Sequence, residues 1–204
     1  MLKRTSIDFI NSLISNNTKW KVLDIGCGFR ANENATVIAD IKDFSEYYKN
    51  KKFIKIESKK LPFNDKEFDF VIASHVIEHI DDFEFFVKEL ERISSKGYIE
   101  LPTRLGDNLV FENKNDHIWW FTYDDINNQI LASKRNQLID PFMTVSTGKI
   151  FEEMFRESLV LEIVWENKIE YKITNELKFE KFKKISFLQL IKKYFSKIIR
   201  RNLK

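Results

Sequence analysis

The chain has 204 residues, 43% of them hydrophobic and 32% charged, which is ordinary for one folded domain with a full hydrophobic core. A single cysteine excludes an internal disulfide framework, and no apolar run reaches the roughly 18 residues of a transmembrane helix. The formal net charge is +3, but residues 178–204 hold ten Lys or Arg and one acid, a net of +9, which leaves −6 elsewhere. An acidic body argues against a nucleic-acid groove. We therefore expect a cytoplasmic protein without a secretory signal and without nucleic acid as a partner.

The spacing of apolar residues predicts alternating helices and strands along the first half of the chain. A helix begins behind Ser6, a residue type that caps helices. Short strands are predicted at residues 20–25, 36–41, 52–57, 68–74 and 97–102, and a helix at residues 83–93. In the second half, the pattern predicts helices at residues 123–133 and 149–156, and a closing pair of strands at residues 159–174.

Strands that alternate with helices indicate βαβ units. The sequence therefore predicts an α/β fold: a Rossmann-like, doubly wound, mostly parallel sheet in three α/β/α layers, with a C-terminal antiparallel hairpin strand that turns at Asn167. We expect this domain to span residues 1–175 and a basic tail to span residues 176–204. Ligands of such sheets bind beyond the carboxyl ends of the strands.

Two glycines stand at one of these carboxyl ends. The stretch VLDIGCGF places Gly26 and Gly28 directly after the first strand, behind Asp24. Glycine permits positive φ and lets a ligand press against the backbone, and a carboxylate at the end of the next strand, Asp40, can accept both hydroxyls of a ribose. An ordinary tight turn and a capping role for Asp40 are the alternatives. The dinucleotide pattern GxGxxG is incomplete, because its last position is Ala31.

Taken together, VLDIGCG, Asp40 and LPFNDKEFDFVIASHVIEHIDD resemble the class I S-adenosylmethionine-dependent methyltransferases, most closely the group that acts on small molecules and glycans. The resemblance covers residues 20–102 well and the C-terminal half poorly. It implies S-adenosyl-L-methionine as the cofactor and methyl transfer to an oxygen or nitrogen of a small acceptor. Arg30 departs from the family, which often has a third glycine there, and Glu57 stands where the family usually has aspartate.

The resemblance also implies which residues hold the cofactor. Asp24 and Gly26 should lie against the methionine part, and Asp40 should hold the ribose hydroxyls. Glu57 and the Ser58 backbone should flank the adenine, and the carbonyls of Ser74 and His75 should reach the methionine amine. The complete expected set is Asp24, Gly26, Cys27, Gly28, Asp40, Ile41, Glu57, Ser58, Ser74 and His75.

A hydroxyl acceptor would benefit from a general base, and histidine has the most suitable pKa. We expect His79 and His117 to be catalytic, with Glu78 behind them. An amine acceptor would need no base, and the histidines would then only form pocket walls. The string HVIEH also matches a zinc-protease helix motif. Because His75 directly follows a buried strand, one regular helix is not expected to carry both of its histidines, and we expect no metal site.

The segment HIWWF, residues 117–121, lies beyond the fifth strand, where this fold often builds its acceptor pocket. Its aromatic faces would suit sugar rings, and similar segments occur in methyltransferases that resemble polysaccharide-modifying ones. The alternative is a segment packed in the core. We expect a saccharide or lipid-linked glycan precursor as the acceptor, with a small metabolite or lipid as the nearest alternative. A non-catalytic binding or scaffold protein is the alternative from a different class.

The tail has an apolar stripe and a basic side at helical spacing. A basic amphipathic helix is typical of membrane-surface or partner binding. We therefore expect residues 178–204 to associate peripherally with a membrane. A helix packed on the body or on a second subunit is the alternative, and the oligomeric state stays open. The stripe comprises Ile185, Leu188, Ile191, Phe195, Ile198 and Ile199, and the basic side comprises Lys184, Lys192, Lys193, Lys197, Arg200 and Arg201.

Overall fold

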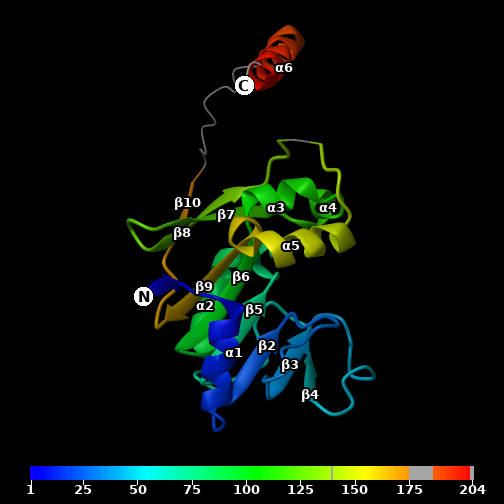
Figure 1. Ribbon diagram of the computed structural model, residues 1–204. Helices are drawn as coiled ribbons and strands as arrows, with labels where there is room; N and C mark the ends of the chain where they lie inside the picture. Colours follow the sequence, from blue (N-terminus) through cyan, green and yellow to red (C-terminus); the bar gives the residue numbers. More distant parts are fainter. Residues whose placement is uncertain (139, 175–185, 203–204) are drawn as a thin grey trace.

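The computed structural model describes residues 1–138, 140–174 and 186–202. Its centre is a seven-stranded sheet in the order β1-β9-β6-β5-β2-β3-β4 (Figure 1). The five strands from β6 to β4 run parallel, and β9 and β1 add antiparallel strands at one edge. The strands are β1 (Leu2–Arg4), β2 (Val22–Ile25), β3 (Val37–Asp40), β4 (Lys52–Lys55), β5 (Phe70–Ser74), β6 (Lys96–Pro102) and β9 (Val160–Glu166). The predicted mostly parallel α/β sheet is thus confirmed.

Apolar side chains cover both faces of the sheet, as expected for parallel strands buried on both sides. Helix α1 (Ile7–Asn16) packs Ile10 and Ile14 on one face, and the Ser6 side chain caps its first turn as predicted. Helix α2 (Phe83–Ile93) covers the other face and has the predicted bounds. Its amphipathic spacing and its cap, Asp82, explain why the sequence locates it so well.

The connections from β2 to β3 and from β3 to β4 contain no helix. The Tyr48 hydroxyl joins them, because it accepts a hydrogen bond from the Ala31 amide and donates one to the Gly28 carbonyl, both at 2.9 Å. Phe29 packs edge-on against Phe44, with 4.7 Å between the ring centroids. Side-chain contacts therefore order these two loops where longer βα units would use helices.

A second sheet, with strand order β10-β8-β7, packs on the same face as α2. It comprises β7 (Trp119–Asp124), β8 (Gln129–Lys134) and β10 (Tyr171–Ile173). The prediction of a helix at residues 123–133 is therefore wrong. The Asp124 carboxylate accepts hydrogen bonds from the amides of Ile126 and Asn127 and forms a turn, after which Ile130 and Ala132 alternate into the core.

The prediction that residues 159–174 form a closing hairpin is also wrong. Its first strand is nevertheless antiparallel in the main sheet, as predicted. Strand β9 pairs with β6 and β1, whereas β10 leaves the main sheet and pairs in parallel with β8. Asn167 does make the turn, with a φ of 63°. Its amide donates to the Ser95 carbonyl, which directs the chain away from β9.

Three helices lie above the carboxyl ends of the parallel strands (Figure 1). They are α3 (Arg104–Leu109), α4 (Asn113–Asp116) and α5 (Val145–Leu159), and α5 contains the helix predicted at residues 149–156. At Gly106 of α3, a Cβ atom would lie 2.7 Å from the Leu159 carbonyl oxygen, so only glycine permits this close packing on α5. The remaining helix is α6 (Phe187–Asn202). None of the helices in the described ranges is long and apolar enough to span a membrane.

Candidate functional site

A cavity of about 1150 Å³ opens at the carboxyl ends of β2, β3 and β5. It is larger than the range of about 300–1,000 Å³ that is usual for small-molecule sites, so it has room for two ligands side by side. Side chains of the loops after β2, β3 and β4, of the short 3₁₀ helix η1 (Ile77–His79), of α2 and of α4 line it. Seven residues expected at the cofactor line this cavity: Gly26, Gly28, Asp40, Ile41, Glu57, Ser58 and His75.

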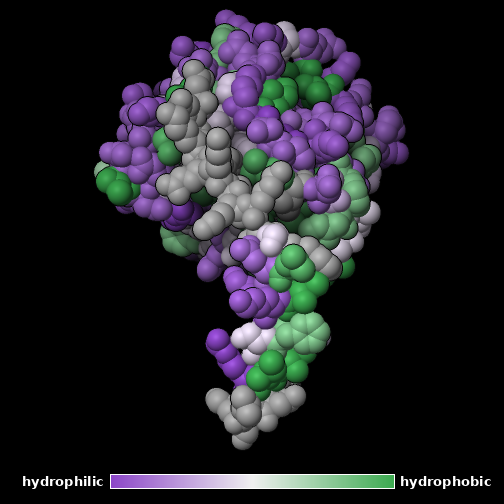
Figure 2. Space-filling view, turned by 90° about the horizontal axis from the view of Figure 1, so that it is seen from above, coloured by the Kyte–Doolittle hydropathy of each residue, from purple (hydrophilic) through white to green (hydrophobic). Residues whose placement is uncertain are grey.

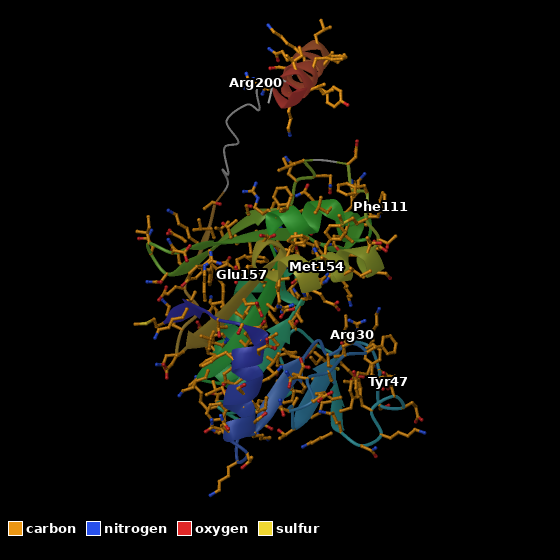
Figure 3. All side chains as sticks on the ribbon, viewed as in Figure 1. Arg30, Tyr47, Phe111, Met154, Glu157 and Arg200 are labelled. Carbon is orange, nitrogen blue, oxygen red and sulfur yellow. The ribbon has the colours of Figure 1, made fainter. Side chains whose placement is uncertain are left out.

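The glycine loop presents its backbone to the cavity. Gly26 and Gly28 have φ values of 73° and 49°, in the left-handed region that favours glycine. A Cβ atom on Gly26 would overlap the Val76 side chain, whereas beside Gly28 there is open space. Arg30 is exposed and lies on the same loop, with Tyr47 on the neighbouring loop, both below α5 in the view of Figure 3. Arg30 therefore does not block the backbone that faces the cavity.

Asp40 stands at the end of β3 with its carboxylate at the cavity wall. One oxygen accepts a hydrogen bond from the Gly28 amide at 3.0 Å, and the other accepts one from the Lys42 amide at 2.9 Å. Each carboxylate oxygen keeps a further lone pair, so the side chain can accept two hydroxyl groups while it holds the glycine loop. This arrangement fits the ribose of a nucleoside cofactor.

Asp24, Cys27 and Ser74 lie behind the cavity wall instead of lining it. The Asp24 carboxylate accepts the Asn32 amide at 2.7 Å, and burial raises its pKa to about 7. The Cys27 side chain packs in the core beneath α1, where burial raises the pKa of the thiol to about 12. The Ser74 hydroxyl donates to a Glu100 oxygen at 3.1 Å. In this structure the three side chains support the loops that line the cavity.

Exposed polar residues and aromatic rings line a further part of the cavity. Glu57 lies 3.2 Å from Lys55, and the Ser58 hydroxyl donates to the Lys60 carbonyl. The aromatic lining was not predicted from the sequence. Its signals there are the Phe that follows Gly28 and the FEFF pattern of α2. The rings belong to Phe29, Phe44, Phe85 and Phe86. Flat, apolar faces of this kind suit an adenine ring.

His75 is held in a left-handed conformation, with a φ of 54°, between two carboxylates. Its Nε2 lies 3.1 Å from Glu100 and its Nδ1 3.2 Å from Glu78. Burial disfavours the charged ring, but the hydrogen bonds to Glu100 and Glu78 outweigh it and raise the pKa of His75 to about 10. Because His75 is outside η1 and has a non-helical conformation, it does not share a regular helix with His79.

A network of buried charged groups joins this site to α5. The Arg156 guanidinium lies 2.5 Å from Glu100 and 3.0 Å from Glu162, and the Tyr98 hydroxyl contacts both carboxylates. Although burial favours a neutral Glu100, hydrogen bonds from His75 and Tyr98 and the charge of Arg156 lower its pKa to about 2. Glu100 therefore stays ionised and ties α5 to the end of β6.

The structure brings the two expected catalytic histidines together. The rings of His79 and His117 pack edge to face, with 4.5 Å between their centroids. His79 Nδ1 lies 2.9 Å from the Asp116 carbonyl oxygen, and His117 Nδ1 lies 2.5 Å from an Asp107 carboxylate oxygen. Since both partners are acceptors, each Nδ1 carries a hydrogen, and Nε2 is the nitrogen of each ring that does not make this contact.

Asp107 contacts His117 and was not predicted from the sequence. Its carboxylate is fully buried and accepts hydrogen bonds from Trp120 Nε1 at 2.5 Å and from Arg135 Nε at 2.7 Å, in addition to that of His117. No motif marks it, because its partners come from β7 and from the segment after β8. The arrangement fixes the orientation of the His117 ring.

The prediction that the aromatic rings of HIWWF form an acceptor pocket is wrong. Trp119, Trp120 and Phe121 are buried, and Trp119 packs edge-on against Phe83 at 4.8 Å between ring centroids. The alternative, a segment packed in the core, is confirmed. The apolar side chains of β7 pack in the same core cluster as those of α2. From this segment, His117 is the residue whose ring contacts His79.

Part of the chain matches a known family model. Residues 23–99 match the family model of the methyltransferase domain, which covers the glycine loop, Asp40 and the segment through β5 to β6. No curated protein matches the chain.

Among solved structures, the chain is similar to the PH0226 protein of Pyrococcus horikoshii, with 20% identity over 79% of this chain and 89% of that one and a TM-score of 0.46. An S-adenosylmethionine-dependent methyltransferase from Mesorhizobium loti is 11% identical over 72% of this chain and 90% of its own, with a TM-score of 0.42. A methyltransferase of this kind from Aquifex aeolicus is 13% identical over 76% and 88%, with a TM-score of 0.39. Similarities at this level carry no information about the acceptor.

Proposed function

Since residues 23–99 match the model of the methyltransferase domain, we propose that the protein is a class I S-adenosylmethionine-dependent methyltransferase that methylates an oxygen or nitrogen of a small acceptor, a saccharide or lipid-linked glycan precursor. The observation that carries this proposal is the single cavity that joins the glycine loop and Asp40 to His79 and Asp116. S-adenosyl-L-methionine, when bound, supplies the activated methyl group. The chain supplies positioning and the removal of the acceptor proton.

The cofactor end of the cavity is defined by the carboxylate of Asp40 and the open backbone of Gly28. We propose that Asp40 accepts the ribose hydroxyls, that the glycine loop lies against the methionine part, and that Glu57 and Ser58 flank the adenine. The open space beside Gly28 and the unshared lone pairs of Asp40 support this placement. The carbonyls of Ser74 and His75, at the end of β5, then face the methionine amine.

The acceptor end lies between η1, the start of α2 and the end of α4. Asp81, Asp82, Asn115 and Asp116 line it. Carboxylates and an amide accept hydrogen bonds from hydroxyl groups. This lining supports a hydroxyl-rich acceptor with its reactive group toward His79.

In the proposed reaction the acceptor lone pair would take the methyl group from the bound cofactor, and S-adenosylhomocysteine would be released. A hydroxyl acceptor must also lose its proton. His79 lines the acceptor end and the buried ring of His117 packs against it, so we propose that His79 promotes that loss with His117 behind it. Asp107 acts through His117 as a positioning residue.

We also infer that α6 binds the surface of an anionic membrane. Figure 2 shows its hydrophobic side chains on one side of the helix and hydrophilic ones on the other. Leu188, Phe195 and Ile199 are exposed on the apolar side, and the basic side includes Lys192 and Lys193. Ile185 and Lys184, which the sequence analysis assigned to these stripes, lie outside the described residues. Each basic residue near an anionic bilayer contributes about 1 kcal/mol.

Vesicle sedimentation tests this inference. The protein should sediment with vesicles of phosphatidylserine and phosphatidylcholine and should remain in solution with phosphatidylcholine alone. Replacing Lys192 and Lys193 by Glu should abolish sedimentation, whereas binding to neutral vesicles or unchanged binding of the variant would refute the anionic surface as the target.

Methyl transfer from methyl-labelled S-adenosylmethionine tests the proposed acceptor. We expect labelled product with free or lipid-linked saccharides. If labelled product forms only with small metabolites or simple lipids, the acceptor belongs to one of these classes and the proposed saccharide is wrong. Cofactor binding without product from any acceptor would favour the non-catalytic alternative.

A further inference from the structure

We propose that Glu78, His79 and His117 form a binding site for a divalent transition-metal ion at the acceptor end of the cavity. One carboxylate oxygen and one nitrogen of each ring lie within 4.8 Å of one another. Two imidazoles and one carboxylate are a set that holds zinc in catalytic sites and related metals in facial triads. Zinc keeps its ligands at about 2.0–2.2 Å, so modest side-chain rotations would close the site.

The surroundings of the two histidines are those of metal ligands. A metal-bound imidazole usually donates its other ring N–H to a carboxylate or a backbone carbonyl, which fixes its orientation. His117 makes this contact to Asp107, and His79 makes it to the Asp116 carbonyl. Both rings are thus held by Nδ1, which leaves Nε2 as the nitrogen that can coordinate an ion.

Glu78 supplies a second and independent indication. Its side chain is fully buried, and its Oε2 atom has no hydrogen-bond partner among the described residues. The other oxygen, Oε1, lies 3.2 Å from His75. An unpaired oxygen of a buried carboxylate costs free energy unless a donor or a cation compensates it. A cation coordinated beside His79 and His117 would supply that compensation.

The geometry indicates what such an ion would do. Glu78 and the His117 side chain are buried, whereas His79 is exposed and lines the cavity, so further coordination positions would face the acceptor. A zinc site with three protein ligands keeps a position open for a small oxygen ligand. An acceptor hydroxyl bound there would lose its proton to water more readily, because the ion stabilises the alkoxide. With the ion bound, the two Nε2 atoms are ligands, so this role would replace the proton removal proposed for the free histidine pair. This role rests on the proposed function, but the binding of the ion does not.

Metal titration of the untagged protein, stripped with a chelator, tests the site. We expect one Zn²⁺ per chain by calorimetry, and Co²⁺ should give the visible absorption of a site with nitrogen and oxygen ligands. His79→Ala and Glu78→Gln should each weaken Zn²⁺ binding at least about tenfold. Asp81→Asn is the matched control, because Asp81 is an exposed acid that lines the same cavity.

Because His79 is exposed, its alanine variant should stay folded, which circular dichroism would verify. Absence of Zn²⁺ binding and of Co²⁺ absorption in the parent protein would overturn the proposal, as would unchanged Zn²⁺ affinity in folded His79→Ala. Methyl transfer that continues undiminished in chelator would remove the ion from catalysis and leave the proposed function intact. Zn²⁺ binding without methyl transfer to any acceptor would support the site and refute the function.

Discussion

Asp40→Ala is expected to weaken the binding of S-adenosylhomocysteine by about 100-fold or more. Each hydrogen bond to a charged group contributes about 1.5–3 kcal/mol, and the proposed site has two of them to the ribose. The substitution also removes the acceptor for the Gly28 amide, so the glycine loop loses one of its supports. Calorimetric titration of the parent protein and of the variant with S-adenosylhomocysteine measures the change directly.

Asp43→Ala is the matched control for this prediction. Asp43 belongs to the same loop after β3, is exposed, and accepts a hydrogen bond from the local Ser45 amide. Its replacement should leave the affinity within about twofold. If Asp40→Ala retains full affinity while its thermal unfolding matches that of the parent, Asp40 does not bind the ribose.

Asp107→Asn is expected to lower the melting temperature by roughly 10 °C. Asp107 is the buried partner of His117, Trp120 and Arg135, and an amide offers only one oxygen to these three donors. Removing one partner of a buried ion pair lowers the free energy of unfolding by about 3–5 kcal/mol. For a chain of this size, each kcal/mol corresponds to about 2–4 °C. Scanning calorimetry of both proteins provides the comparison.

Asp116→Asn serves as the control for Asp107→Asn. Asp116 is exposed, and it contacts His79 through its backbone carbonyl, which the substitution preserves. Its melting temperature should therefore equal that of the parent protein. A drop of less than about 2 °C for Asp107→Asn would mean that the buried arrangement around this carboxylate does not stabilise the fold.

The first half of the fold could be predicted from the sequence because its signals are local. The cap at Ser6, the amphipathic spacing of α2 and the apolar runs of β2, β3 and β5 each lie within a short window. The second half could not, because β10 is placed by its parallel pairing with β8 about forty residues earlier. The pattern within residues 123–133 predicted a helix. The structure instead has a turn between two strands, which the Asp124 side chain forms through its hydrogen bonds.

The candidate site divides in the same way. The glycine loop and Asp40 follow a strand-end pattern that can be read along the chain, and both line the cavity. His79 and His117 were expected as two separate candidates, and their contact was not predicted. They lie far apart in the sequence, like His79 and Asp116, which are 37 residues apart, and only the fold brings them together. Asp107 and the orphaned oxygen of Glu78 become visible only in three dimensions.

The central claim is that the cavity above β2 and β3 binds S-adenosyl-L-methionine, and titration of the purified parent protein by calorimetry tests it most directly. We predict that S-adenosylmethionine and S-adenosylhomocysteine each bind with one site per chain and a dissociation constant near 1 μM, about −8 kcal/mol. Absence of binding of both compounds at millimolar concentration to folded protein would contradict the account.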